Sequence, residues 1–146
     1  MICTFFGHSN TPPSVEALLE DKIVNLIESR GVSKFYVGNH GGFDYIVLSV
    51  LKRIKAKYKH IKYYVVLAYL PTRLKEFDTT DYTDTIYPEG LEDVPYKFAI
   101  SKRNEWMIEQ SDFVIAYVNR SFGGAYTYYK KAKNKGKEVI NIKSAE

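Results

Sequence analysis

Short apolar runs alternate with longer segments of helical periodicity along this chain. The apolar runs lie at 2–6, 35–37, 63–70, 112–118 and 139–142, and their lengths suit buried strands. The segments between them predict helices at 15–28, 43–58, 100–110 and 125–134. Strands that alternate with helices are typical of a parallel sheet with right-handed crossovers. The pattern therefore predicts an α/β fold, doubly wound around a mainly parallel five-stranded sheet, in one domain over residues 1–146.

Two of these elements carry further local signals. Ser14 stands where an N-cap of the first helix is expected, and Gly31 stands where that helix should stop. The run 63–70 is apolar throughout, which predicts a central strand covered on both faces.

The segment 71–98 breaks the alternation and predicts a long insertion after the third strand. It contains three prolines, many acidic groups, and Tyr82, Tyr87 and Tyr96. Loops of this length in compact domains are usually functional or mobile.

Composition narrows the class of protein. Hydrophobic residues make up 45% of the 146 residues, which suits one globular core. No apolar run approaches the roughly 20 residues of a membrane span, and the N-terminus lacks the basic region and cleavage site of a signal peptide. Cys3 is the single cysteine, so no intrachain disulfide forms. We expect a cytoplasmic protein that does not associate with a membrane.

The formal net charge of +4 suits an anionic ligand without identifying one. Two lysine-rich clusters carry much of it, at 52–62 and 130–137. Lysines near helix C-termini favour solvated helix faces, so we rank a nucleic-acid surface as the lesser alternative.

The turns that follow the predicted strands differ from those at the other edge of the sheet. The first kind lies at 7–10, 38–44, 71–73 and 119–124 and is rich in glycine and small polar residues. The opposite turns, 29–31 and 135–137, are ordinary. Ligands of open α/β sheets bind outside the carboxyl ends of the strands, so this asymmetry predicts a site at that edge.

Each chemical signal in these turns has a plain structural alternative. Gly123-Gly124 is either a tight turn or a phosphate cradle at a helix N-terminus, to which Thr127 would add a hydroxyl donor. His8 and His40 are acid–base candidates, although a lone turn histidine is more often a polar surface residue.

Other motifs are undecided or absent. Arg103-Asn104 opens the third helix and points either into the crevice or to solvent. No cluster has metal-ligand spacing, and neither a nucleophile elbow nor a Walker-type phosphate loop occurs. Cys3 lies on the first strand, where a buried thiol is expected rather than a nucleophile. We predict no metal site and no cofactor.

In combination these residues resemble the SLOG superfamily, a Rossmann-like group that includes the DNA-processing protein A fold and the LONELY GUY phosphoribohydrolases. Within it, the YpsA/YspA-like branch matches over nearly the whole chain outside 71–98. Four positions depart from its motifs: Ser9, Asn39, His40 and Ala125. The matching positions are Gly7, His8, Gly38, Gly42, Phe43, Asp44, Pro71, Arg103, Asn104, Ser111, Asp112, Gly123, Gly124, Thr127, Ala132, Gly136 and Lys137.

The resemblance implies a nucleotide or nucleotide-derived ligand in the crevice. Phosphoribohydrolases of the superfamily carry a glutamate three residues after the threonine, and Lys130 stands there. A lysine opposes the positive charge of an oxocarbenium-like sugar, whereas it can hold a phosphate. We therefore expect a binding protein, a sensor or a sequestering protein, without typical phosphoribohydrolase activity.

The sequence is also compatible with two other functions. The first is an N-glycoside-cleaving nucleoside 5′-monophosphate hydrolase, with Asp44 and Arg103 as catalytic candidates, although Asp44 can equally bond a ribose or cap the second helix. The second is a DNA- or RNA-binding module. We also expect a homo-oligomer that associates through helical faces. The predicted ligand-binding residues are Gly7, His8, Gly38, Asn39, Gly42, Asp44, Arg103, Asn104, Gly123, Gly124 and Thr127.

Overall fold

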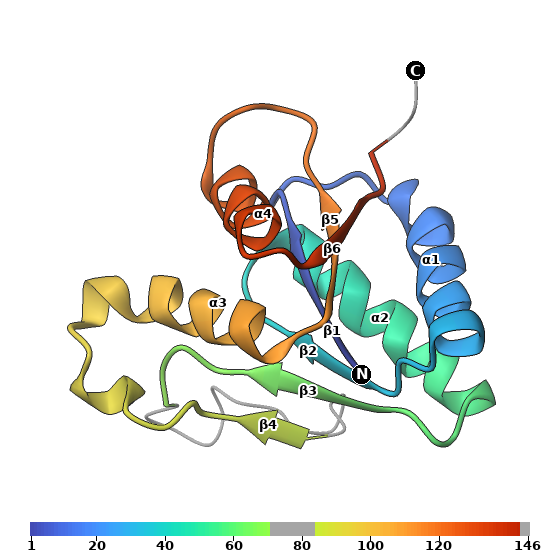
Figure 1. The fold of residues 1–146 in the computed structure, drawn as a ribbon, viewed down its shortest axis with the longest axis horizontal. Helices are drawn as coiled ribbons and strands as arrows, with labels where there is room; N and C mark the ends of the chain where they lie inside the picture. The colour runs from blue at the N-terminus through green and yellow to red at the C-terminus, as the bar shows by residue number, and fades with distance from the viewer. Residues whose placement is uncertain (71–83, 144–146) are drawn as a thin grey trace.

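The computed structural model describes residues 1–70 and 84–143, which form a parallel sheet between two layers of helices (Figure 1). The six described strands follow the order β4-β3-β2-β1-β5-β6, and every neighbouring pair is parallel. The strands are β1 (Ile2–Gly7), β2 (Lys34–Val37), β3 (Lys62–Val66), β4 (Asp84–Ile86), β5 (Phe113–Tyr117) and β6 (Glu138–Asn141).

The helices divide between the two faces of the sheet. Figure 1 shows α1 (Val15–Arg30) and α2 (Gly41–Lys57) on one face, and α3 (Ala99–Gln110) and α4 (Gly124–Asn134) on the other. Two single-turn helices, η2 (Leu91–Asp93) and η3 (Tyr96–Phe98), lead from β4 into α3. None of the helices in the two described ranges is long and apolar enough to cross a membrane.

Strand side chains alternate between two hydrophobic clusters. Cys3 and Phe5 belong to the cluster that packs under α1 and α2, whereas Phe6 belongs to the smaller cluster under α3 and α4. Successive side chains of a strand point to opposite faces, so one short apolar run supplies both clusters. Burial raises the pKa of the Cys3 thiol, which keeps it protonated and inert.

The α/β fold and its parallel sheet are confirmed, but the predicted number of five strands was wrong. The sixth strand, β4, lies inside the segment 71–98 that we predicted as an insertion. It is three residues long and, among the strands of residues 1–70 and 84–143, pairs only with Tyr64 to Val66 of β3. An edge strand this short is held by backbone hydrogen bonds and leaves no run of apolar residues for pattern reading.

Several predicted boundaries also shift. The apolar run 63–70 was expected to be strand throughout, yet β3 ends at Val66. Beyond it the Leu67 N–H still bonds the Ile86 carbonyl at 2.8 Å, and Leu67 and Ala68 stay buried. Burial outside the ladder therefore explains why the apolar run is longer than the strand.

Of the two residues predicted to end α1, Gly31 acts as expected and Ser14 does not. Gly31 ends the helix in the left-handed conformation, with φ of 71°, as glycine does at this position. Ser14 occupies the N-cap position but makes no side-chain capping bond. The Pro12 and Pro13 carbonyls instead accept from the N–H groups of Val15 and Glu16, at 3.1 and 3.0 Å.

Candidate functional site

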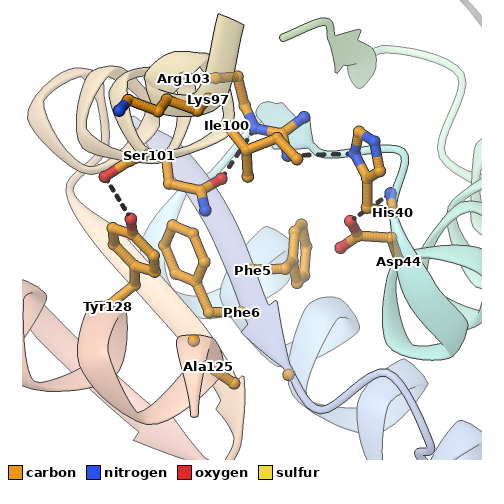
Figure 2. Close-up of a pocket in the computed structure, with 13 residues that line it drawn as sticks. Phe5, Phe6, His40, Asp44, Lys97, Ile100, Ser101, Arg103, Ala125 and Tyr128 are labelled. Atoms are coloured by element: carbon orange, nitrogen blue, oxygen red, sulfur yellow. Dashed lines mark hydrogen bonds between the residues drawn. The ribbon is translucent and has the colours of Figure 1, made fainter.

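A cavity of about 390 Å³ lies at the carboxyl edge of the sheet, where the turns after β1, β2 and β5 meet (Figure 2). The predicted gathering of these three turns is therefore correct, whereas the turn 71–73 lies outside the described residues, as does Tyr82. The lining residues are Phe5, Phe6, Gly7, His40, Asp44, Lys97, Ile100, Ser101, Arg103, Asn104, Gly124, Ala125 and Tyr128.

Arg103 is the buried cation of this cavity. Only 2% of its surface is exposed, and Nη1 donates to the Val66 carbonyl at 2.8 Å. Nε donates to Asn104 Oδ1 at 2.8 Å and Nη1 also to Asn39 Oδ1 at 3.4 Å, while Nη2 lies 3.4 Å from His40 Nδ1. Every one of these acceptors is neutral, so the guanidinium is held in place but its charge is not neutralised by a hydrogen-bonded carboxylate.

Asp44 faces the same cavity and also caps α2. Its Oδ2 accepts the backbone N–H of His40 at 3.1 Å, which supports the capping alternative. Gly38 lies between the two charged groups. A Cβ at Gly38 would stand 2.8 Å from Asp44 Oδ2 and 3.2 Å from Arg103 Nη1. A larger residue than glycine would therefore displace the Asp44 or the Arg103 side chain.

Burial raises the pKa of Asp44 from 3.8 to about 6, against the opposing effects of the His40 N–H and the charge of Arg103. The carboxyl therefore changes charge only slightly below neutral pH. Burial also lowers the pKa of Arg103, an effect that Asp44 opposes. The cavity gains net positive charge when Asp44 takes up a proton.

An Asp44→Asn variant is expected to lose one component of the pH dependence of stability. The raised pKa means that folded protein holds this proton more tightly than the unfolded chain does. The stabilisation of the folded state by the protonated Asp44 carboxyl is fully present below pH 3.8 and is lost as the pH rises through about 6. Urea unfolding at several pH values between these limits should show wild type losing stability relative to the variant as the pH rises. A relative gain would contradict the assignment.

The start of α4 forms the wall opposite Arg103. Gly123 has φ of 94°, a conformation that favours glycine, and it directs the chain into the helix at Gly124. A Cβ at Gly124 would meet nothing within 4 Å, so this helix terminus is open. The first N–H groups of an α-helix lack partners inside the helix and attract anions.

Two residues of α4 that the family motifs single out do not line the cavity. Thr127 is exposed, and its hydroxyl donates to the Gly123 carbonyl at 3.1 Å within its own helix. The ammonium of Lys130 lies over the Tyr126 ring, 5.6 Å from the centroid. The residue that α4 presents to the cavity is Tyr128, whose hydroxyl bonds Ser101 Oγ at 2.7 Å.

The two histidines differ in their surroundings. His8 is 3% exposed and lies outside the cavity lining. Its Nε2 accepts the Asn119 N–H at 3.2 Å, so it ties the turn after β1 to the turn after β5. His40 lines the cavity beside Arg103. Burial, then the charge of Arg103, lowers the pKa of His40, and the ring is neutral near neutral pH.

The remaining predicted residues position the turns. A Cβ at Gly7 would lie 2.2 Å from Cγ of Phe43, and one at Gly42 would lie 2.4 Å from the Ser9 carbonyl oxygen. Both glycines therefore permit close packing, and Gly7 also lines the cavity. Asn39 and Asn104 act through Arg103, whose guanidinium they orient.

Sequence reasoning missed the lining residues that helix faces supply. Lys97, Ile100 and Ser101 share the inner side of η3 and α3 with Arg103 and Asn104. Their spacing of three and four residues indicates a shared helix face. The sequence of the turns alone does not reveal that this face lines the cavity. Among the residues described, no three side chains of His, Cys, Asp or Glu gather to hold a metal ion.

Comparisons with known proteins agree with the fold. A family model described as the YspA SLOG family matches residues 2–144. DNA processing protein A from Streptococcus pneumoniae has a similar structure, with a TM-score of 0.64 and 18% sequence identity over 94% of this chain and 48% of that chain. The chain thus spans about half the length of that protein. No curated protein matches the sequence.

A second solved structure is matched over a larger share of its own length. The molybdenum cofactor carrier protein of Chlamydomonas reinhardtii is similar with a TM-score of 0.61 and 14% identity, over 99% of this chain and 78% of that chain. At such identities both neighbours show a shared fold.

Proposed function

Since the chain belongs to the YspA SLOG family, we propose that it binds a nucleotide-derived small molecule in the cavity at the carboxyl edge of the sheet. The observation that carries the proposal is Arg103: a guanidinium 2% exposed, in a cavity wall, with only neutral hydrogen-bond acceptors. A buried cation is costly unless it is paired. The charge of Asp44 offsets part of this cost without a hydrogen bond to the guanidinium, and an anionic ligand would supply a hydrogen-bonded countercharge.

Two further features of the cavity favour an anion. Lys97 lines it and forms no ion pair with another described residue; its ammonium rests 5.2 Å from the centroid of the Phe98 ring. The open N-terminus of α4 adds backbone donors at Gly124 and Ala125 on the facing wall. A phosphate between these walls would receive charge-assisted hydrogen bonds, which are roughly twice as strong as neutral ones.

A flat aromatic surface beside the cavity suits a nucleobase. Tyr69 and Tyr96 stack with centroids 4.2 Å apart, and the Tyr69 hydroxyl donates to the Tyr96 carbonyl at 3.0 Å. Tyr69 also meets the edge of His40, which lines the cavity. Since Tyr96 is 76% exposed, its free ring face is open to stacking by a base.

We propose holding rather than cleaving as the activity of this site. Lys130, where the resemblance leads one to expect a glutamate, lies outside the cavity lining. Asp44 is the one carboxylate among the described lining residues, and Oδ2 already accepts the His40 N–H. The carrier named in the Chlamydomonas structure is a binding protein on a similar fold, which is compatible with this proposal.

Cleavage of an N-glycosidic bond is the second candidate. The pKa of Asp44, raised to about 6 by burial, favours it, because a carboxyl in that range is suited to proton transfer. Release of free base from nucleoside 5′-monophosphates, measured by chromatography and abolished by Asp44→Asn, would establish this alternative and overturn the first.

Mass spectrometry of small molecules that co-purify with the protein tests binding directly. Calorimetric titration with a panel of nucleoside mono- and diphosphates then gives affinities. We expect saturable binding of at least one member without release of base. A protein that co-purifies with no nucleotide derivative and binds none of the panel would overturn the proposal.

A further inference from the structure

A second cavity, of about 370 Å³, lies where the chain leaves β3 and β4. Its lining comes from the residues that follow these two strands, from η2 and from the first residue of α3. The second cavity is therefore at the carboxyl edge of the sheet, as the first is, and ligands of open α/β sheets bind at this edge. Its volume is within the range of small-molecule sites.

The two cavities adjoin through Tyr69. This residue lines the second cavity, and its ring meets the edge of His40, which lines the first, with centroids 6.5 Å apart. Tyr69 also interacts electrostatically with Arg103. Tyr96 lines the second cavity, and the next residue, Lys97, lines the first. One molecule can therefore extend from Arg103 into the second cavity.

The side chains that line the second cavity suit a flat ring. Tyr69 and Tyr96 stack with their planes 21° apart, and Tyr87 adds a third aromatic side chain. Leu91, which is 5% exposed, contributes apolar surface. Because the adjoining cavity contains the cation of Arg103, a ring that also carried positive charge would be disfavoured. A neutral nucleobase on an anionic nucleotide meets both conditions.

Glu92 is the one charged side chain among the described residues that line the second cavity. Its carboxylate has no hydrogen-bond or ion-pair partner within residues 1–70 and 84–143. By contrast, Glu105 and Glu109 of α3 pair with lysines of α4. A carboxylate accepts hydrogen bonds and donates none, so Glu92 favours a ring that presents N–H groups.

Guanine differs from the other common bases in the donors that it offers. It presents two N–H donors side by side, at N1 and at the 2-amino group, and the two oxygens of a carboxylate can accept both. Adenine places an acceptor, N1, beside its amino group, and a carboxylate repels that acceptor. Enzymes that read an isolated base combine stacking with hydrogen bonds to this same edge.

We propose that the second cavity is a base subsite selective for guanine. Tyr96 stacks on the ring, and Glu92 accepts hydrogen bonds from N1–H and the 2-amino group. The proposal rests on the proposed function and adds the identity of the base to it. The phosphate of the same nucleotide lies at Arg103 in the first cavity.

Calorimetric titration with the 5′-monophosphates of guanosine, inosine, adenosine, cytidine and uridine tests this subsite. These nucleotides share the ribose phosphate, so differences in affinity report on the base. Wild type should bind the guanosine nucleotide about tenfold or more tightly than the adenosine nucleotide, the scale of one hydrogen bond to a charged group. The inosine nucleotide, which keeps N1–H but lacks the 2-amino group, should fall between them.

Glu92→Gln should weaken binding of the guanosine nucleotide about tenfold. Its affinity for the adenosine nucleotide should equal or exceed that of wild type, because an amide can pair with the amino group and ring nitrogen of adenine. Asp93→Asn is the matched control, since it removes a carboxylate from the same single-turn helix but outside the cavity lining. It should leave both affinities unchanged.

Three results would overturn the guanine subsite and leave nucleotide binding at Arg103 intact. The first is a wild-type affinity for the adenosine nucleotide that equals or exceeds that for the guanosine nucleotide. The second is a Glu92→Gln protein that weakens both nucleotides alike, and the third is an Asp93→Asn protein with the same loss as Glu92→Gln. Failure of every nucleotide to bind wild type would overturn the proposed function together with this inference.

Discussion

Arg103→Ala is expected to weaken nucleotide binding by about 10- to 150-fold, the range for hydrogen bonds to charged groups. The substitution removes the buried guanidinium that lines the cavity and donates to the Val66 carbonyl. Arg103→Lys should recover only part of the affinity, because an ammonium keeps the charge but lacks the planar fork that Asn39, Asn104 and His40 orient. Isothermal titration calorimetry with the nucleotide identified by co-purification measures the effect.

The control for this experiment is Arg53→Ala, which removes an arginine whose partners are Glu16 and Glu20 on the α1–α2 face. Its affinity for the nucleotide should equal that of wild type. Circular dichroism establishes that each variant is folded before titration. An Arg103→Ala protein that is folded and binds with wild-type affinity would remove Arg103 from the site.

Gly7→Ala is expected to produce the largest loss of stability, lowering the free energy of unfolding by about 1–3 kcal/mol or more, as overpacking of a core does. The new methyl group would lie 2.2 to 2.7 Å from ring atoms of Phe43. Phe43 is 1% exposed and belongs to the cluster under α1 and α2. Its ring can move away only by displacing other core side chains.

Urea unfolding measures this loss, and Gly124→Ala is its matched control. A Cβ at Gly124 meets nothing within 4 Å and the residue begins α4, so alanine there should be neutral or stabilising by up to about 1 kcal/mol. Equal stability of the two variants would show that the close approach of Gly7 to Phe43 does not limit the size of the residue tolerated at position 7.

The fold was predictable from the chain because its elements are long enough to show their period. The alternation of apolar runs with helical segments predicted the parallel sheet, and the sheet in turn placed the turns after β1, β2 and β5 together. β4 was not predictable, since three residues paired on one side carry no hydrophobic pattern. The rule that ligands bind at the carboxyl edge of a parallel sheet therefore indicated where the cavity lies. The motifs were a less reliable guide to which residues line it.

Which side chains enter the cavity depends on how each helix is rotated about its axis, and tertiary packing sets that rotation. Spacing alone left the direction of Arg103 open, and the structure buries it in the cavity wall. Thr127 matches the family motif and Lys130 stands where the phosphoribohydrolases carry a glutamate, yet α4 turns Tyr128 toward the cavity instead of either.

The pairing of β1 with β5 also constrains the order in which this protein assembles. Cys3 lies beside Phe113 in that pair, so the two strands meet only after a long stretch of intervening chain has been made. Contacts of such sequence separation form late and slowly. During synthesis, β1, α1, β2, α2 and β3 can associate before β5 leaves the ribosome. The edge of the sheet between β1 and β5 is then completed only after the first half has formed, and a ligand bound there stabilises the finished molecule without guiding its first half.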